Sequence, residues 1–288
     1  MYFIGYDALT RHIAIENGTY DPNNYCDTNV TYTLSSTSDV ETFLTRFNYS
    51  NHYVDNDTNT ALKLGNKITI PSNSTWYVAG FDVEKNKTAS DGTVYDNGYG
   101  IALVPVSNYF GWKSEWDYTI KNGYINSIIH TSGIPKIMSR MQSILGTHLI
   151  NRNVLLGSAT DMPDQITSSM DIIEVRTTAY TWATSYGTCM SGCQLTGNAA
   201  SYSNKYDDGE ANYKLPLFDN IEYNVTSITN NFWLRGISAA SSNYEFALIA
   251  GYDNDDNVIK SSNVKRFYTT SGSVIKAEYY MRPLIYIR

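Results

Sequence analysis

FWLRG at positions Phe232–Gly236 and MRPLIYI at positions Met281–Ile287 are the stretches that decide the fold of this chain. Each combines bulky apolar residues with one arginine. Successive side chains of a strand point to opposite faces, so at least one of Trp233 and Leu234 must face a core. The pattern is typical of the closing half of a β-rich module that holds arginines among apolar residues.

Arg235 has two interpretations. Its guanidinium can donate several hydrogen bonds to backbone carbonyls or to a carboxylate inside a core. Alternatively, Arg235 and nearby aromatic rings could line a ligand site. Because a buried arginine needs protein partners before it can serve a ligand, packing is the favoured interpretation. The predicted structural core motif therefore consists of Trp233, Leu234, Arg235, Arg282 and Pro283.

The composition is poor in charge and rich in aromatic rings. Charged residues make up 17% of the 288 residues, and 25 residues are Tyr, whereas an average soluble protein carries about 25% charged residues. Neutral hydrogen-bonding side chains and amphipathic rings suit contact with proteins or carbohydrates. AT-rich coding would produce the same bias without any selection for binding.

Charge and hydropathy exclude several classes of partner. The net charge is −7 and no basic stripe is visible, so nucleic acid is not an expected ligand. No apolar run approaches the roughly 18 residues that span a bilayer, and the N-terminus lacks a signal-peptide pattern.

Cys189 and Cys193 have no second ligand pair for zinc. Reduced thiols, as in a bacterial cytoplasm, are expected there and at Cys26.

Apolar spacing predicts an α+β fold dominated by strands. Short strands are expected throughout, and helices are expected over residues 36–47, with Ser38 as the cap, and over 122–150, divided at Gly133 and Pro135. We predict a mixed antiparallel sheet with about two helices. Residues 1–60 are expected to form a small N-terminal β/α segment for docking or oligomerisation, and residues 61–288 a β-rich module.

Two acidic clusters were considered for chemistry. Asp207, Asp208 and Glu210 carry paired carboxylates of the kind that glycosidases use, but a solvated loop explains them better. The series Asp253, Asp255 and Asn257 alternates as in a calcium loop. It lacks the distal Glu and central Gly of such loops, so no metal is expected. We predict neither a cofactor nor enzymatic activity, with a glycan-acting enzyme as the remote alternative.

Polar loops are the expected contact surfaces. The candidates are the loop over residues 185–210, which is expected to be exposed, and the loop over residues 238–243. Within and beside them, Tyr202, Tyr206 and Tyr244 are candidates for contact with a glycan or a protein partner, since tyrosine rings often stay partly wet.

Several short motifs occur in an order that resembles a module of uncharacterised function in structural proteins of bacteriophages that infect gut bacteria. Members of that group often carry WWLR and RP motifs like those quoted above. The further matches are Gly65–Ile70, Val78–Asp82, Gly123–Asn126, Leu145–Leu156 and Ala211–Phe218. The resemblance covers roughly residues 61–288 and leaves residues 1–60 outside it.

The resemblance implies a virion protein, assembled in the host cytoplasm, with a fold related to the C-type lectins. The expected role is a capsid decoration or head-fibre subunit displayed on the particle. The alternative is a tail appendage or receptor-binding adhesin that recognises a host-surface polysaccharide. Expected partners are other virion proteins and further copies of the chain, because virion parts are symmetric. The resemblance carries over no catalytic residue.

Overall fold

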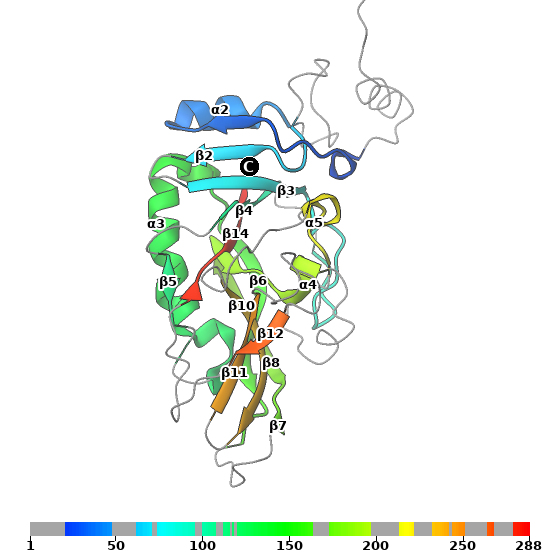
Figure 1. Cartoon of the computed structure of the whole chain (residues 1–288), viewed down its shortest axis with the longest axis vertical. Helices are drawn as coiled ribbons and strands as arrows, with labels where there is room; N and C mark the ends of the chain where they lie inside the picture. Colours follow the sequence, from blue (N-terminus) through cyan, green and yellow to red (C-terminus); the bar gives the residue numbers. More distant parts are fainter. Residues whose placement is uncertain are drawn as a thin grey trace, which may run out of the picture.

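Two mixed β-sheets, a two-stranded antiparallel ribbon and two longer helices make up the protein in the computed structural model (Figure 1). The structure describes residues 21–47, 62–70, 74–95, 100–107, 112–115, 117, 120–163, 173–196, 213–221, 232–241, 244–250, 264–267 and 279–288. The predicted α+β class with more strand than helix is confirmed.

The main sheet has six strands in the order β1-β2-β3-β4-β14-β9. These are β1 (Thr31–Thr33), β2 (Lys67–Ile70), β3 (Ser74–Phe81), β4 (Ile101–Pro105), β14 (Pro283–Ile287) and β9 (Gly187–Cys189). β1 pairs with β2 in parallel, and all other neighbours are antiparallel. The C-terminal strand β14 thus lies inside the sheet, between β4 and β9; Figure 1 shows it next to β4.

Burial along the main sheet follows position. All residues of β4 and β14 are buried, as expected for strands covered on both faces. β2 alternates instead: Ile68 and Ile70 are buried, whereas Lys67 and Thr69 are half-buried. The core is therefore centred on β4 and β14.

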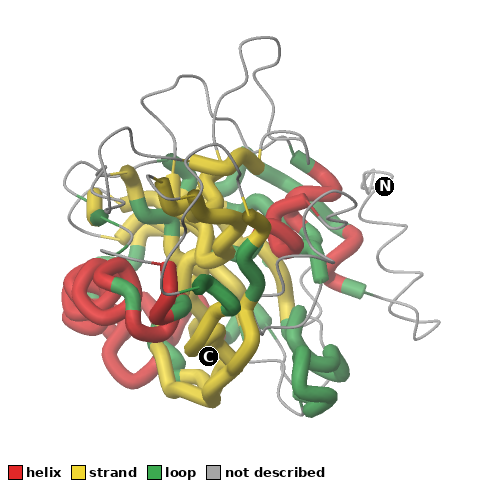
Figure 2. The backbone as a smooth tube through the Cα atoms, turned by 90° about the horizontal axis from the view of Figure 1, so that it is seen from below, coloured by secondary structure: helices red, strands yellow, loops and turns green. Residues whose placement is uncertain are grey.

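The second sheet is built around β10 (Phe232–Ser241). Its other strands are β5 (Lys113–Ser114), β7 (Ile173–Glu174), β11 (Tyr244–Ala250), β12 (Val264–Phe267) and β13 (Tyr279–Tyr280). β10 pairs antiparallel with β11 and β7 and parallel with β13. The ribbon consists of β6 (Arg152–Thr160) and β8 (Thr177–Ser185). Figure 2 shows the strands at the centre with helices at the sides.

The helix α2 (Thr37–Leu44) lies beside β2 at one end of the molecule (Figure 1). Its cap is Ser36 and not Ser38 as predicted. The Ser36 hydroxyl accepts a hydrogen bond from Asp39 N at 3.2 Å, and the Asp39 carboxylate accepts one from Ser36 N at 2.9 Å. Both serines are followed three residues later by an acid, but this reciprocal pair forms only at Ser36.

The helix α3 (Ile134–Leu145) follows a short π-helix, η4 (Ile129–Gly133), without a break. Gly133 has right-handed helical backbone angles, so the predicted division there becomes a change of helix type. A Cβ on Gly133 would lie 2.6 Å from Met281 Sδ. Glycine therefore permits the close approach of this helix to the MRPLIYI stretch.

Short helical turns complete the described structure. They are η1 (Pro22–Asn24), η2 (Ile120–Asn122), η3 (Tyr124–Asn126), η5 (Gly146–His148), α4 (Gly192–Thr196) and α5 (Leu217–Asn220). Within the described ranges, none of the helices combines the length and apolar character needed to cross a bilayer.

The described part of the N-terminal segment joins the main sheet and the core. β1 extends the sheet beyond β2, and Phe43 and Phe47 of the α2 region are buried. The ring of Phe47 stacks on that of Phe81 from β3, with ring centroids 4.8 Å apart. The boundary at residue 60 stays a prediction.

Candidate functional site

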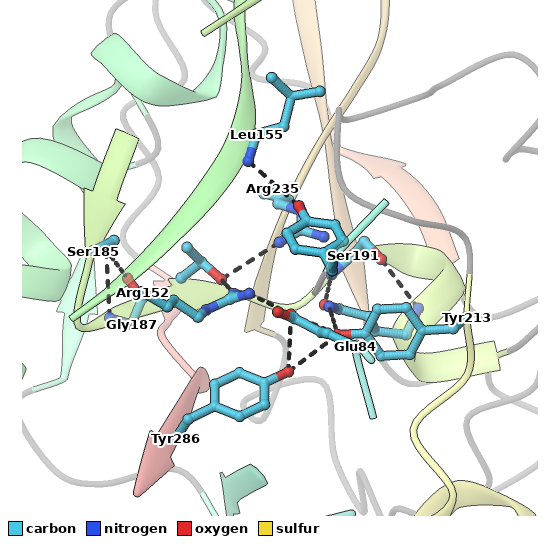
Figure 3. Close-up of polar contacts among 12 residues, drawn as sticks. Glu84, Arg152, Leu155, Ser185, Gly187, Ser191, Tyr213, Arg235 and Tyr286 are labelled. Atoms are coloured by element: carbon cyan, nitrogen blue, oxygen red, sulfur yellow. Dashed lines mark hydrogen bonds and ion pairs between the residues drawn. The ribbon is translucent and has the colours of Figure 1, made fainter. Parts of the chain in front are cut away.

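Glu84 is the centre of a buried polar cluster between the sheets (Figure 3). Its Oε1 accepts hydrogen bonds from Tyr213 at 2.9 Å and from Tyr286 at 3.0 Å, and it forms an ion pair with Arg152. The side chains of Glu84 and Arg152 are both completely buried. Four distant segments of the chain therefore meet at one carboxylate oxygen.

The turn after β3 directs Glu84 inward. Asp82 and Asn86 flank it with φ angles of 46° and 62°, a left-handed conformation that Asp and Asn tolerate better than most residues. Asp82 also accepts a hydrogen bond from Gly100 N at 2.7 Å. The turn is thus fastened to the start of β4.

Arg152, the first residue of β6, has a second and a third contact. Its Nη2 donates to Thr188 Oγ1 at 3.0 Å, and its guanidinium carbon lies 4.8 Å from the centroid of the Tyr286 ring. Buried charges are tolerated when paired and hydrogen-bonded. Glu84 Oε1 and the two Nη atoms of Arg152 meet that condition through each other, Thr188 of β9, Tyr286 of β14 and Tyr213.

Arg235 on β10 joins the same cluster from the second sheet. Its Nη1 donates to Thr188 Oγ1 at 3.4 Å, and its backbone N–H donates to Met190 O at 3.2 Å. Only 1% of Arg235 is exposed. Thr188 thus links two guanidinium groups, and with them β6, β9 and β10.

The FWLRG and MRPLIYI stretches also contact each other. The Arg282 guanidinium lies 4.7 Å from the centroid of the Phe232 ring, within the range of a cation–π contact. Trp233 Nε1 donates to Ser114 O at 2.8 Å. Trp233 and Leu234 are both buried, and Pro283 begins β14 opposite Cys189. The structure thus places all five predicted core-motif residues in the interior.

Three further residues bring polar groups to the same region. Cys189 N donates to Tyr124 Oη at 2.8 Å, and the His130 ring lies 5.0 Å from the Tyr124 ring. Burial raises the pKa of Cys189 to about 12, and burial, followed by the nearby Arg235 charge, lowers the pKa of His130 to about 4. At neutral pH the thiol is protonated and the imidazole is neutral, so Cys189 is not set up as a nucleophile.

The predicted exposed loop over residues 185–210 is wrong for its first part. β9 covers residues 187–189 and α4 residues 192–196, and Thr188, Ser191 and Gln194 are buried. Ser191 and Gln194 exchange hydrogen bonds, and Gln194 Nε2 donates to Tyr213 Oη at 2.9 Å. Because these polar groups find partners inside, a polar sequence is buried here.

The second predicted loop, residues 238–243, is also mostly strand. β10 continues to Ser241, which pairs with Tyr244 at the start of β11. Tyr244 therefore lies beside a strand connection. The contact candidates Tyr202 and Tyr206 lie outside the described residues. So do the two acidic clusters for which a solvated loop was the favoured interpretation: Asp207, Asp208 and Glu210, and Asp253, Asp255 and Asn257.

The central residues of the cluster were missed by the sequence analysis. Glu84 and Arg152 are 68 positions apart, and no local pattern connects them. Arg152 does lie within the quoted stretch Leu145–Leu156, where a lone arginine between apolar segments was an available signal. Tyr213 and Tyr286 lie within other quoted stretches but are not distinguished there from 23 further tyrosines, since the chain has 25.

Among the described residues, no group of three or more His, Cys, Asp or Glu side chains could hold a metal ion. The polar framework consists of Glu84, Arg152, Thr188, Tyr213, Arg235 and Tyr286, whose side chains are buried and joined by hydrogen bonds and one ion pair. No protein-family model, curated protein or solved structure matches the chain.

Proposed function

We propose that this chain is a structural protein of a bacteriophage particle, displayed on the surface as a capsid decoration or head-fibre subunit. The proposal rests on the resemblance of the motifs and on what those motif residues do in the fold. Its nearest variant is a tail appendage.

The observation that carries the proposal is that buried residues of the motif stretches make contacts between separate parts of the fold. Arg152, Arg235, Arg282 and Tyr286 come from three separate motif stretches, and all are buried. Their contacts join the main sheet, the second sheet and the ribbon. A module whose characteristic residues maintain its shape suits a protein that is displayed and assembled in many copies.

The edge of the main sheet offers a place for assembly. Among the described residues, β1 pairs with β2 alone, and Thr31 and Thr33 are exposed. An unpaired strand edge presents N–H and C=O groups that can pair with another chain. In this proposal residues 1–60 contribute to docking on the particle or on sister subunits.

Quantitative mass spectrometry of purified particles tests the proposal. The protein is expected in a fixed ratio to the major capsid protein across particles banded on two successive density gradients. A host cytoplasmic protein of similar abundance serves as the carry-over control. Loss of this chain in parallel with that control would overturn the proposal.

A further inference from the structure

A surface hollow of about 690 Å³ lies where the end of α3 meets the last residues of the chain. Its walls come from three segments: Gln142 to Asn151, Tyr186 between β8 and β9, and Arg288. Small-molecule sites typically measure about 300–1,000 Å³. The hollow therefore has room for one or two sugar units.

The backbone of the hollow is fastened by hydrogen bonds. Ile150 N donates to Tyr286 O at 2.9 Å, and Arg288 N donates to His148 O at 3.0 Å. The His148 ring nitrogen Nδ1 lies 2.9 Å from Arg288 O. A site held by such contacts is formed before a ligand arrives, which lowers the entropic cost of binding.

The side chains around the hollow combine a ring with neutral hydrogen-bonding groups. Tyr186 is half-buried and packs against the core, so its ring is held in place. Gln142, Thr147 and Asn151 supply amide and hydroxyl groups that both donate and accept. Ile150 adds apolar surface. A pyranose presents the matching chemistry, with C–H faces for a ring and hydroxyl groups for the amides.

The charge of the lining favours a neutral ligand. Among the residues that the structure describes, no Asp or Glu lines the hollow, and Arg288 is the only charged lining residue. Phosphate or nucleotide sites bring several cationic or backbone N–H donors together. We propose that this hollow binds a neutral saccharide unit of a polysaccharide. This binding goes beyond the proposed virion role and does not depend on it.

Affinity electrophoresis in native gels tests the site directly. The full chain is run through gels that contain neutral dextran, yeast mannan or arabinogalactan, through a gel that contains acidic polygalacturonate, and through a gel without polysaccharide. Retardation by at least one of the three neutral polysaccharides is expected. Tyr186→Ala and Asn151→Ala are each expected to weaken it about tenfold or more, because each removes a contact of the order of 1.4 kcal/mol.

Tyr180→Ala is the matched control. Tyr180 lies in β8 and is half-buried like Tyr186, but it does not line the hollow. Its replacement should therefore leave retardation unchanged. Asn151 is exposed, so its variant is expected to fold even if Tyr186→Ala does not.

Three results would overturn the inference. They are no retardation in any neutral gel, equal retardation of both variants and the wild type, and retardation by polygalacturonate alone. Each is read on purified protein, so it is independent of where the protein lies on a particle.

Discussion

Arg152 and Arg235 donate hydrogen bonds to the same oxygen, Thr188 Oγ1, at 3.0 and 3.4 Å. Two like charges are thereby held near one hydroxyl in the interior. The arrangement is tolerable because the Glu84 carboxylate balances the charge of Arg152, and because Thr188 Oγ1 accepts a hydrogen bond from each guanidinium group. The framework thus depends on a few side chains, and removing one of them should destabilise both sheets.

Replacing Glu84 with Gln should destabilise the fold strongly. The change removes the counter-charge of Arg152 while keeping a similar shape, and breaking a buried pair in this way typically costs about 3–5 kcal/mol. Urea unfolding of the two proteins measures the difference. Asp219→Asn is the control, because the Asp219 side chain is 63% exposed in its ion pair with Lys214 and the pair should contribute little. Equal effects of the two changes would contradict the assigned role of Glu84.

Replacing Thr188 with Val should cost about 1–3 kcal/mol, because two buried guanidinium groups lose an acceptor. Thr188→Ser keeps the hydroxyl and should recover most of the stability. Chemical denaturation of both variants, compared with the wild type, provides the measurement. If Val were tolerated as well as Ser, the shared oxygen would not hold the framework together.

Acid should destabilise the protein in part through His130. The pKa of the folded imidazole is about 4, below its ordinary value of 6.5, because of burial and then the charge of Arg235. Between these values the unfolded chain binds a proton that the folded chain does not. Stability should therefore fall as the pH drops from about 6.5 to about 4, by up to about 3 kcal/mol from this group.

His130→Phe tests this by removing the titrating group while keeping a ring beside Tyr124. The slope of unfolding free energy against pH should become shallower over that window, since the carboxylates titrate in both proteins. An unchanged slope in the Phe variant would show that His130 is not buried in its neutral form.

Gly123→Ala should destabilise the packing of η3 against β6. Gly123 has a φ of 68°, and a Cβ there would lie 2.6 Å from Gly157 O. Backbone strain alone costs of the order of 1 kcal/mol or more, and the collision adds to it. Gly92→Ala isolates the strain, because φ is 85° but no atom lies within 4 Å of the added Cβ. Thermal melting should show a clearly larger loss at position 123.

The local helices were largely predictable from the sequence, whereas the contacts within the framework were not. The spacing of Val40, Phe43 and Leu44 predicts α2, and that of Ile137, Met138, Met141 and Leu145 predicts α3. These signals act over one or two turns. The contact between Glu84 and Arg152 depends on how distant strands pair, which no local pattern records.

The polarity of residues 185–196 misled the sequence analysis for a related reason. Thr188, Ser191 and Gln194 look like loop residues when read alone. Each is buried because its partner comes from another segment: Arg152 and Arg235 for Thr188, and Tyr213 for Gln194. A polar composition indicates an exposed segment only where the fold brings no hydrogen-bonding partner to its side chains.

A cryo-EM map of the intact particle tests the central proposal most directly. The account predicts repeated density on the outside of the head, into which the main sheet, the second sheet and α3 fit as one body, with the β1 end nearest the shell. Such density on the tail would support the nearest variant. A particle map that accounts for all external density with other proteins and leaves no place for this fold would contradict the account.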